Sequence, residues 1–230
     1  MTDDSMPGEP DSVADAYAGD RYQRLTLTGD PSSTGHRVLH RLLEAGEASQ
    51  YHPRVLEVGA NRGEHLAHVR HRWDDYVMVD LDDRRTDQNW PPGSRFVVAD
   101  AHDLPFPDAH FDRTIVTCVL HHLEDPETAL RELRRVTRPE GRISILIPTD
   151  PGLAYRAVRS VTSGRRARRN GVAAEQRLSH AREHRNHFAS LLTMARSVFE
   201  TDDIIERYFP FPIRTWNANL VTVLRIRRGS

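Results

Sequence analysis

The sequence contains no lysine and a single cysteine, and these absences limit what the protein can be. All 32 basic residues among the 230 are therefore arginines. Cys118 has no partner for an internal disulfide and cannot build a cysteine-based zinc site alone. No apolar run approaches the roughly 18 residues that a membrane span requires, and the acidic start is not typical of a signal peptide. We therefore expect a cytoplasmic protein without a membrane span.

Charge is distributed unevenly along the chain. Residues 1–20 carry six acids and no base, whereas residues 151–200 carry ten arginines and three acids. A polar segment with few large apolar residues does not bury enough surface to fold, so residues 1–20 are predicted to be a mobile acidic N-terminus. Residues 21–230 are long enough to form one large α/β domain.

Apolar segments with strand character alternate with helical patterns along this domain. The predicted strands are Val55–Val58, Tyr76–Val79, Arg95–Ala99, Thr114–Val119 and Arg142–Ile147. The predicted helices include Glu64–Arg70 and Pro126–Val136. This alternation is typical of a parallel sheet with helices on both faces. After Pro148 it stops, which predicts an insertion at about 149–190, and Asn219–Arg227 is predicted to be a last strand at an edge.

The first predicted strand leads into the turn "VLEVGANRGEHL", residues 55–66. Gly59 and Gly63 lie where a missing side chain lets the backbone approach a ligand, and Glu57 makes the turn acidic. A phosphate-binding loop needs a Gly-Lys-Ser/Thr ending, and a dinucleotide fingerprint needs glycines where Asn61 and Glu64 stand. An acidic turn is better suited to a cationic ligand than to pyrophosphate.

Two further acids follow the next predicted strands. Asp80 ends the second strand, where an acid commonly binds the ribose hydroxyls of a nucleoside. Asp100 follows the third strand and could accept a hydrogen bond from an adenine amino group. Ribose, adenine and a cationic remainder together describe S-adenosylmethionine, which is the predicted cofactor.

Four motifs in order resemble the class I S-adenosylmethionine-dependent methyltransferases, in particular the small-molecule branch that includes quinone methyltransferases. The motifs are "LEVGANRG", "VMVDLDD", "ADAHDLPFP" and "FDRTIVTCVLHHLEDP", and they cover roughly Val55 to Pro148. The resemblance implies a Rossmann-like α/β fold with a seven-stranded, mostly parallel sheet, an antiparallel last strand and a helical substrate cap. The final "VTVLRI" resembles the family's last strand.

The resemblance also assigns cofactor contacts residue by residue. It implies contacts with S-adenosylmethionine for Tyr17, Glu57, Gly59, Ala60, Asn61, Gly63, Asp80, Leu81, Asp100, Ala101, Thr117 and Cys118. Asn61 replaces a glycine of the family pattern. Asparagine tolerates left-handed backbone angles better than most residues, so we expect the turn to be preserved.

Histidines are the candidates for catalysis, because a hydroxyl acceptor needs a base that titrates near neutral pH. His121 and His122 follow the fourth predicted strand, and a helix would place His180, His184 and His187 on one face. The candidate catalytic residues are therefore His121, His122, His184 and His187. No metal is predicted, because the sequence ties no carboxylate to these histidines. His65, His68 and His71 are interpreted as a solvated helix face.

The acceptor is predicted to be a small molecule, methylated on oxygen or nitrogen. The run "GRRARRN", residues 164–170, favours an anionic acceptor such as a phosphorylated, sugar-containing or secondary-metabolite intermediate. Nucleic acid is not predicted, because no aromatic residues are interleaved with these arginines. The alternatives are a nicotinamide-dependent oxidoreductase and a protein that binds S-adenosylmethionine without catalysis. The oligomeric state stays open.

Overall fold

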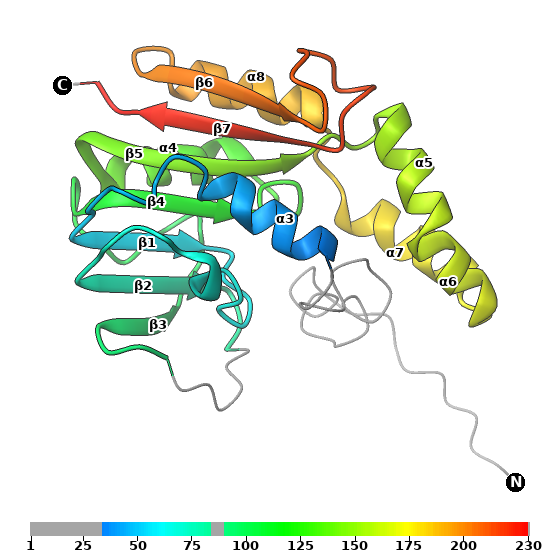
Figure 1. Ribbon diagram of the computed structural model, residues 1–230, viewed down its shortest axis with the longest axis horizontal. Helices are drawn as coiled ribbons and strands as arrows, with labels where there is room; N and C mark the ends of the chain where they lie inside the picture. The colour runs from blue at the N-terminus through cyan, green and yellow to red at the C-terminus, as the bar shows by residue number, and fades with distance from the viewer. Residues whose placement is uncertain (1–33, 84–89, 230) are drawn as a thin grey trace, which may run out of the picture.

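The computed structural model describes residues 34–83 and 90–229, which form a seven-stranded sheet covered by helices (Figure 1). The predicted mobile segment 1–20, including Tyr17, lies outside the described residues. The sheet order is β3-β2-β1-β4-β5-β7-β6. The strands are β1 (Arg54–Val58), β2 (Asp75–Asp80), β3 (Ser94–Val98), β4 (Phe111–Thr117), β5 (Thr137–Pro148), β6 (Asp203–Phe209) and β7 (Val221–Arg227).

The sheet is parallel except for β7, which runs antiparallel to both β5 and β6. This arrangement confirms the predicted Rossmann-like sheet with an antiparallel last strand. The predicted position of that strand was wrong, because β7 lies inside the sheet and β6 forms the edge. The reason is visible in the side chains: most of β7 is buried, whereas exposed and half-buried residues alternate along β6.

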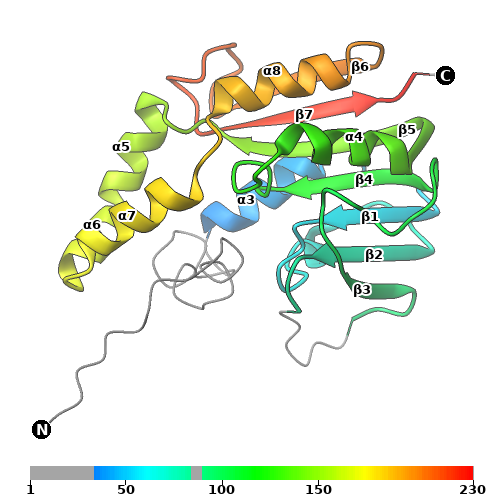
Figure 2. The ribbon, with the colours of Figure 1, turned by 180° about the vertical axis from the view of Figure 1, so that it is seen from behind.

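Helices cover both faces of the sheet (Figures 1 and 2). Helix α3 (Thr34–Leu43) packs on one face, and α4 (Pro126–Val136) and α8 (Phe188–Val198) pack side by side on the other. Helix α4 has the predicted bounds, since Asp125 accepts a hydrogen bond from the backbone N–H of Thr128 and Pro126 occupies the first turn.

The predicted helix Glu64–Arg70 does not form, and the segment contains only the short 3-10 turn η2 (Leu66–His68). The carboxylate of Glu64 turns back to accept hydrogen bonds from the Asn61 side chain and the Arg62 backbone. The ring of His65 meanwhile enters the protein interior. Local polar contacts therefore replace the helical pattern.

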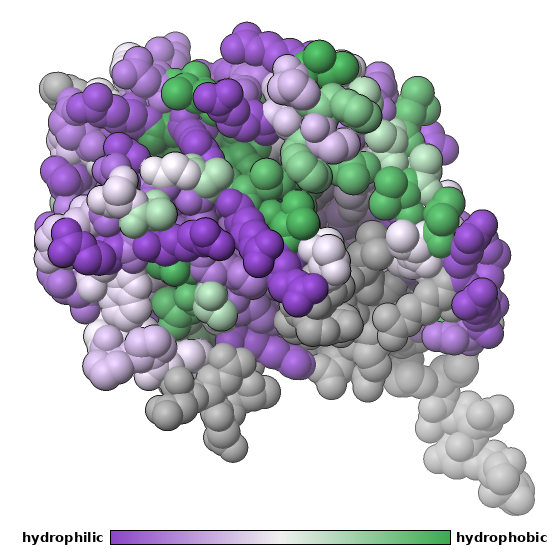
Figure 3. Space-filling view, viewed as in Figure 1, coloured by the Kyte–Doolittle hydropathy of each residue, from purple (hydrophilic) through white to green (hydrophobic). Residues whose placement is uncertain are grey.

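Three helices extend from the sheet beyond the end of β5: α5 (Leu153–Val161), α6 (Ser163–Arg169) and α7 (Ala173–Glu183). They occupy most of the predicted insertion. Figure 3 shows apolar side chains near α5 and the loop between β6 and β7, where Val158 and Phe211 are exposed. Among the described residues, no helix is long and apolar enough to cross a membrane.

Candidate functional site

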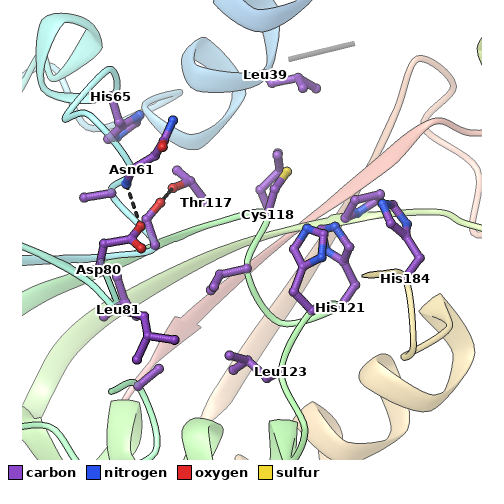
Figure 4. A pocket seen from close by; sticks show the side chains of 18 of the residues that line it. Leu39, Asn61, His65, Asp80, Leu81, Thr117, Cys118, His121, Leu123 and His184 are labelled. Carbon is purple, nitrogen blue, oxygen red and sulfur yellow. Dashed lines mark hydrogen bonds between the residues drawn. The ribbon is translucent and has the colours of Figure 1, made fainter. Parts of the chain in front are cut away.

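A cavity of about 670 Å³ opens at the carboxyl ends of the parallel strands. Strand-end residues of β1, β2 and β4 line one side, and residues of α3, α5 and α7 line the other. This is the edge of a parallel sheet where ligands of open α/β folds bind. Figure 4 shows Asp80 and Asn61 at one end of the cavity, His121 and His184 at the other, and Cys118 between them.

The turn after β1 depends on residues with left-handed backbone angles. Gly59, Asn61 and Gly63 have φ values of 75°, 51° and 77°. A Cβ added to Gly59 would lie 2.7 Å from the Cβ of Val119, so only glycine fits there. The predicted left-handed Asn61 is confirmed. Gly63 packs near Met78 and is not among the cavity-lining residues.

Asp80 and Asp100 line the cavity, as their places at the strand ends predicted. The carboxylate of Asp80 accepts a 2.7 Å hydrogen bond from the backbone N–H of Asn61 and so joins the ends of β1 and β2. Asp100 accepts hydrogen bonds from the backbone and ring of His102. Burial raises the pKa of Asp100, but these hydrogen bonds outweigh it and leave the pKa below its ordinary value.

Glu57 lies beneath the turn and is almost fully buried. Its carboxyl accepts a 2.9 Å hydrogen bond from the hydroxyl of Tyr76. Burial, together with the nearby acids Glu64 and Asp80, raises the pKa of Glu57 to about 8, and the Tyr76 bond only partly opposes the shift. Glu57 is therefore mainly protonated at neutral pH.

Thr117 ends β4 and Cys118 follows it, and both line the cavity. The Thr117 hydroxyl donates to the carbonyl oxygen of Gly59 at 3.0 Å and so links the ends of β4 and β1. Cys118 has a φ of 52°, a strained angle for a residue with a side chain. Burial raises the pKa of its thiol to about 12, so Cys118 is a neutral lining group rather than a nucleophile.

A cluster of histidines forms the far end of the cavity. The ring centroids of His121 and His122 lie 3.9 Å apart, and that of His184 lies 4.4 Å from His121. His180 stacks near His184 with a centroid distance of 3.8 Å. Three of the four predicted catalytic histidines, His121, His122 and His184, are thus brought together from two distant segments.

Burial disfavours the protonated form of three of these histidines. Burial, followed by His122 and His184, holds the pKa of His121 well below its ordinary value. Burial and His184 lower the pKa of His122 to about 3, although its Nδ1 donates to the carbonyl oxygen of Glu183 at 3.0 Å. Burial also lowers the pKa of His184, against a hydrogen bond to Asp150. Neutral imidazoles packed this closely can accept protons or bind cations.

His187 does not join this cluster. Helix α7 ends at Glu183, and His187 precedes α8 as an exposed residue outside the cavity lining. The prediction of one continuous helix carrying His180, His184 and His187 was wrong, because the chain breaks between α7 and α8. The side chain of Asn186 donates to the Leu123 carbonyl oxygen in this break.

The solvated interpretation of His65 and His71 was also wrong, since both are buried. Glu44, 2 % exposed, lies between them, with His65 Nε2 3.2 Å from one of its carboxylate oxygens. The fully buried Arg113 of β4 lies 2.8 Å from the same carboxylate. His65 also lines the cavity beside His40. No sequence pattern links these residues, because they meet only when α3 packs on the sheet.

Most predicted cofactor residues therefore line one cavity. These are Glu57, Gly59, Ala60, Asn61, Asp80, Leu81, Asp100, Ala101, Thr117 and Cys118. Sequence reasoning missed Asp150, Tyr155 and Arg159. Tyr155 and Arg159 line the cavity, and Asp150 lies within hydrogen-bond distance of His180 and His184. Asp150 meets these histidines because the C-terminal end of α7 returns to the loop after β5.

Comparison with known proteins agrees with the resemblance to methyltransferases found in the sequence. Residues 56–145 match the family described as "Methyltransferase domain". A malonyl-[acyl-carrier protein] O-methyltransferase of Halorhodospira halophila is 40% identical over 114 residues, covering 46% of this chain and 39% of that protein. The ubiquinone/menaquinone biosynthesis C-methyltransferase UbiE of Ectopseudomonas mendocina is 33% identical over 144 residues, covering 56% and 55%. The chain thus spans about half the length of the curated relatives it matches.

The fold agrees with solved structures. The 1,6-didemethyltoxoflavin-N1-methyltransferase of Burkholderia thailandensis superposes with a TM-score of 0.62 at 18% identity, covering 99% of this chain and 93% of that one. The described residues thus share the Rossmann-like fold of this solved methyltransferase. Residues 56–145 match the methyltransferase-domain family, in agreement with the resemblance of the four motifs.

Proposed function

We propose that the protein transfers a methyl group from S-adenosylmethionine to the oxygen or nitrogen of a small-molecule acceptor. One observation carries the proposal: a single cavity joins the strand-end residues Asp80 and Thr117 to the histidines around His121, with Cys118 between them. Methyl transfer requires mainly that donor and acceptor be held in line, and a cavity with two chemically different ends suits two ligands.

The strand-end side of the cavity is the proposed cofactor site. Asp80 would bind the ribose hydroxyls, and Asp100 would accept a hydrogen bond from adenine beside Leu81. The turn with Glu57 and Gly59 would hold the methionine part, and a bound cationic ammonium group would favour the ionised form of Glu57. Gly63 would shape this turn from below, since it does not line the cavity.

The α5–α7 side of the cavity is the proposed acceptor site, and residues 149–190 are the proposed cap. Arg159 lines the cavity, which supports an anionic acceptor because a guanidinium pairs well with carboxylate or phosphate. The arginines of α6 are a weaker argument, since Arg165 and Arg168 are exposed. A neutral amine acceptor would need only positioning, whereas a hydroxyl would also need one of the clustered histidines as a base.

Calorimetric titration with S-adenosylmethionine and S-adenosylhomocysteine tests the cofactor directly, with NADH as the control. We expect micromolar affinity for the first two ligands and none for NADH. Binding of NADH would favour the oxidoreductase alternative. Cofactor binding without turnover, across an acceptor screen of amines, phenols and phosphorylated sugars, would instead favour a binding protein.

A further inference from the structure

Three side chains, those of Asp150, His180 and His184, converge at the histidine end of the cavity. Asp150 follows β5, and His180 and His184 are spaced four residues apart at the end of α7. One oxygen of Asp150, Oδ2, lies 2.9 Å from His180 Nε2 and 3.0 Å from His184 Nδ1. Two imidazole nitrogens from one helix turn and one carboxylate oxygen from a distant loop thus surround a common point.

This geometry is close to that of a metal site. Zinc binds imidazole nitrogen and carboxylate oxygen at about 2.0–2.2 Å, which separates tetrahedral ligand atoms by roughly 3.3 Å. The three donor atoms lie within 4.8 Å of one another. Each oxygen–nitrogen distance is thus within a few tenths of an ångström of the separation between two zinc ligands, and coordination would place each imidazole proton on the other ring nitrogen.

We propose that Asp150, His180 and His184 bind one divalent first-row transition-metal ion. Imidazole donors favour zinc, nickel, copper or iron over magnesium and calcium, which prefer oxygen ligands. The single carboxylate provides negative charge beside the two imidazoles.

The ion would fasten helix α7 to the end of β5. In the metal-free protein this connection consists of two hydrogen bonds to one carboxylate. With the ion bound, the wall of the cavity at His184 becomes a rigid surface. The metal site does not depend on the proposed methyl transfer, since none of its ligands belongs to the proposed cofactor end.

Zinc titration of the chelator-treated, tag-free protein tests the proposal. We expect one tightly bound ion per chain, and Asp150→Asn and His180→Ala should each weaken zinc binding by about 100-fold or more. His187→Ala is the matched control, because His187 lies in the same segment but is exposed outside the cluster. Its affinity for zinc should equal that of the unchanged protein.

Two other histidine groups are alternative metal sites, and the variants distinguish them from the proposed one. His121, His122 and His184 could hold an ion without Asp150 or His180, and His40 contacts His36 and His65 near α3. Zinc affinity that survives Asp150→Asn and His180→Ala, but falls in His122→Ala or His40→Ala, would overturn the proposal. So would a protein that binds no zinc.

Folding and cofactor binding are checked separately in each variant. Thermal unfolding without zinc measures the intrinsic cost of His180→Ala, because this side chain is only 18% exposed and contacts Asp150. S-Adenosylhomocysteine affinity should be unchanged in both ligand variants. Failure of S-adenosylhomocysteine to bind even the unchanged protein would contradict the proposed function. The metal proposal would still be decided by the zinc titrations.

Discussion

At the scale of single residues, Asp80 is the strongest test of the cofactor site. A carboxylate that accepts hydrogen bonds from a ribose contributes roughly 1.5–3 kcal/mol for each bond. We expect Asp80→Asn to weaken S-adenosylhomocysteine binding by about 10- to 100-fold in calorimetry. The carboxylate has two accepting oxygens, whereas the amide has one, and its NH2 group only donates. Asp103→Asn is the matched control, because Asp103 is exposed and does not line the cavity. Equal affinities of the two variants would refute the ribose assignment.

Glu57 lowers the free energy of unfolding as the pH rises, which is the opposite of the usual effect of a carboxyl group. Burial raises the pKa of Glu57 from its ordinary 4.5 to about 8 in the folded protein. Between these values the folded protein retains a proton that the unfolded chain has lost, so the free energy of unfolding falls as pH rises. Above the folded pKa, the contribution no longer changes.

The corresponding prediction concerns Glu57→Gln. The amide oxygen can still accept the hydrogen bond from Tyr76, but the side chain has no charge to bury. We expect urea unfolding to show a smaller loss of stability between about pH 5 and about pH 8 in this variant than in the unchanged protein. Parallel pH profiles would mean that Glu57 is ionised in the folded state.

Residue-scale features differ in how far the sequence predicts them. Gly59, Asn61 and Asp80 follow strands, so their meeting at one edge follows from chain order in a parallel sheet. Asp150 and His184 are 34 residues apart in a segment without a repeating pattern. Their contact depends on how the end of α7 returns to the loop after β5, and no local propensity encodes that return.

At the scale of elements, the buried ion pair of Glu44 and Arg113 attaches the end of α3 to β4. Removing one partner leaves an uncompensated buried charge, which typically costs about 3–5 kcal/mol. We expect Arg113→Met to lower the free energy of unfolding by this amount in urea titration. Arg54→Met is the control: Arg54 is 43% exposed beside Asp112, so its loss should cost about 1 kcal/mol or less.

A double variant separates the charge effect from lost packing. Arg113→Met with Glu44→Leu removes both charges, and it should recover part of the stability that either single change loses. Purely additive losses would show that the two charges are not energetically coupled.

The sequence predicts elements best where they are buried on both faces. Strands such as β1 and β2 are short apolar runs, and α4 has a cap and a proline at its start. Strand β6 was not predicted, because its edge position leaves a mixed pattern of exposed and half-buried residues. The segment Glu64–Arg70 has helical spacing, yet its histidines and Glu64 make tertiary and turn contacts that a helix would break.

At the scale of the whole molecule, the cofactor end of the cavity joins the ends of β1, β2 and β4, so a ligand there should stabilise the entire domain. A ligand that binds only the folded state at about 100 times its Kd adds roughly 2.7 kcal/mol to the free energy of unfolding. For a chain of this length, that corresponds to a rise in Tm of about 5–10 °C. S-Adenosylhomocysteine should produce this rise in metal-free protein, and NADH should produce none. A rise confined to one phase of a biphasic transition would instead mean that the α5–α7 segment unfolds separately from the sheet.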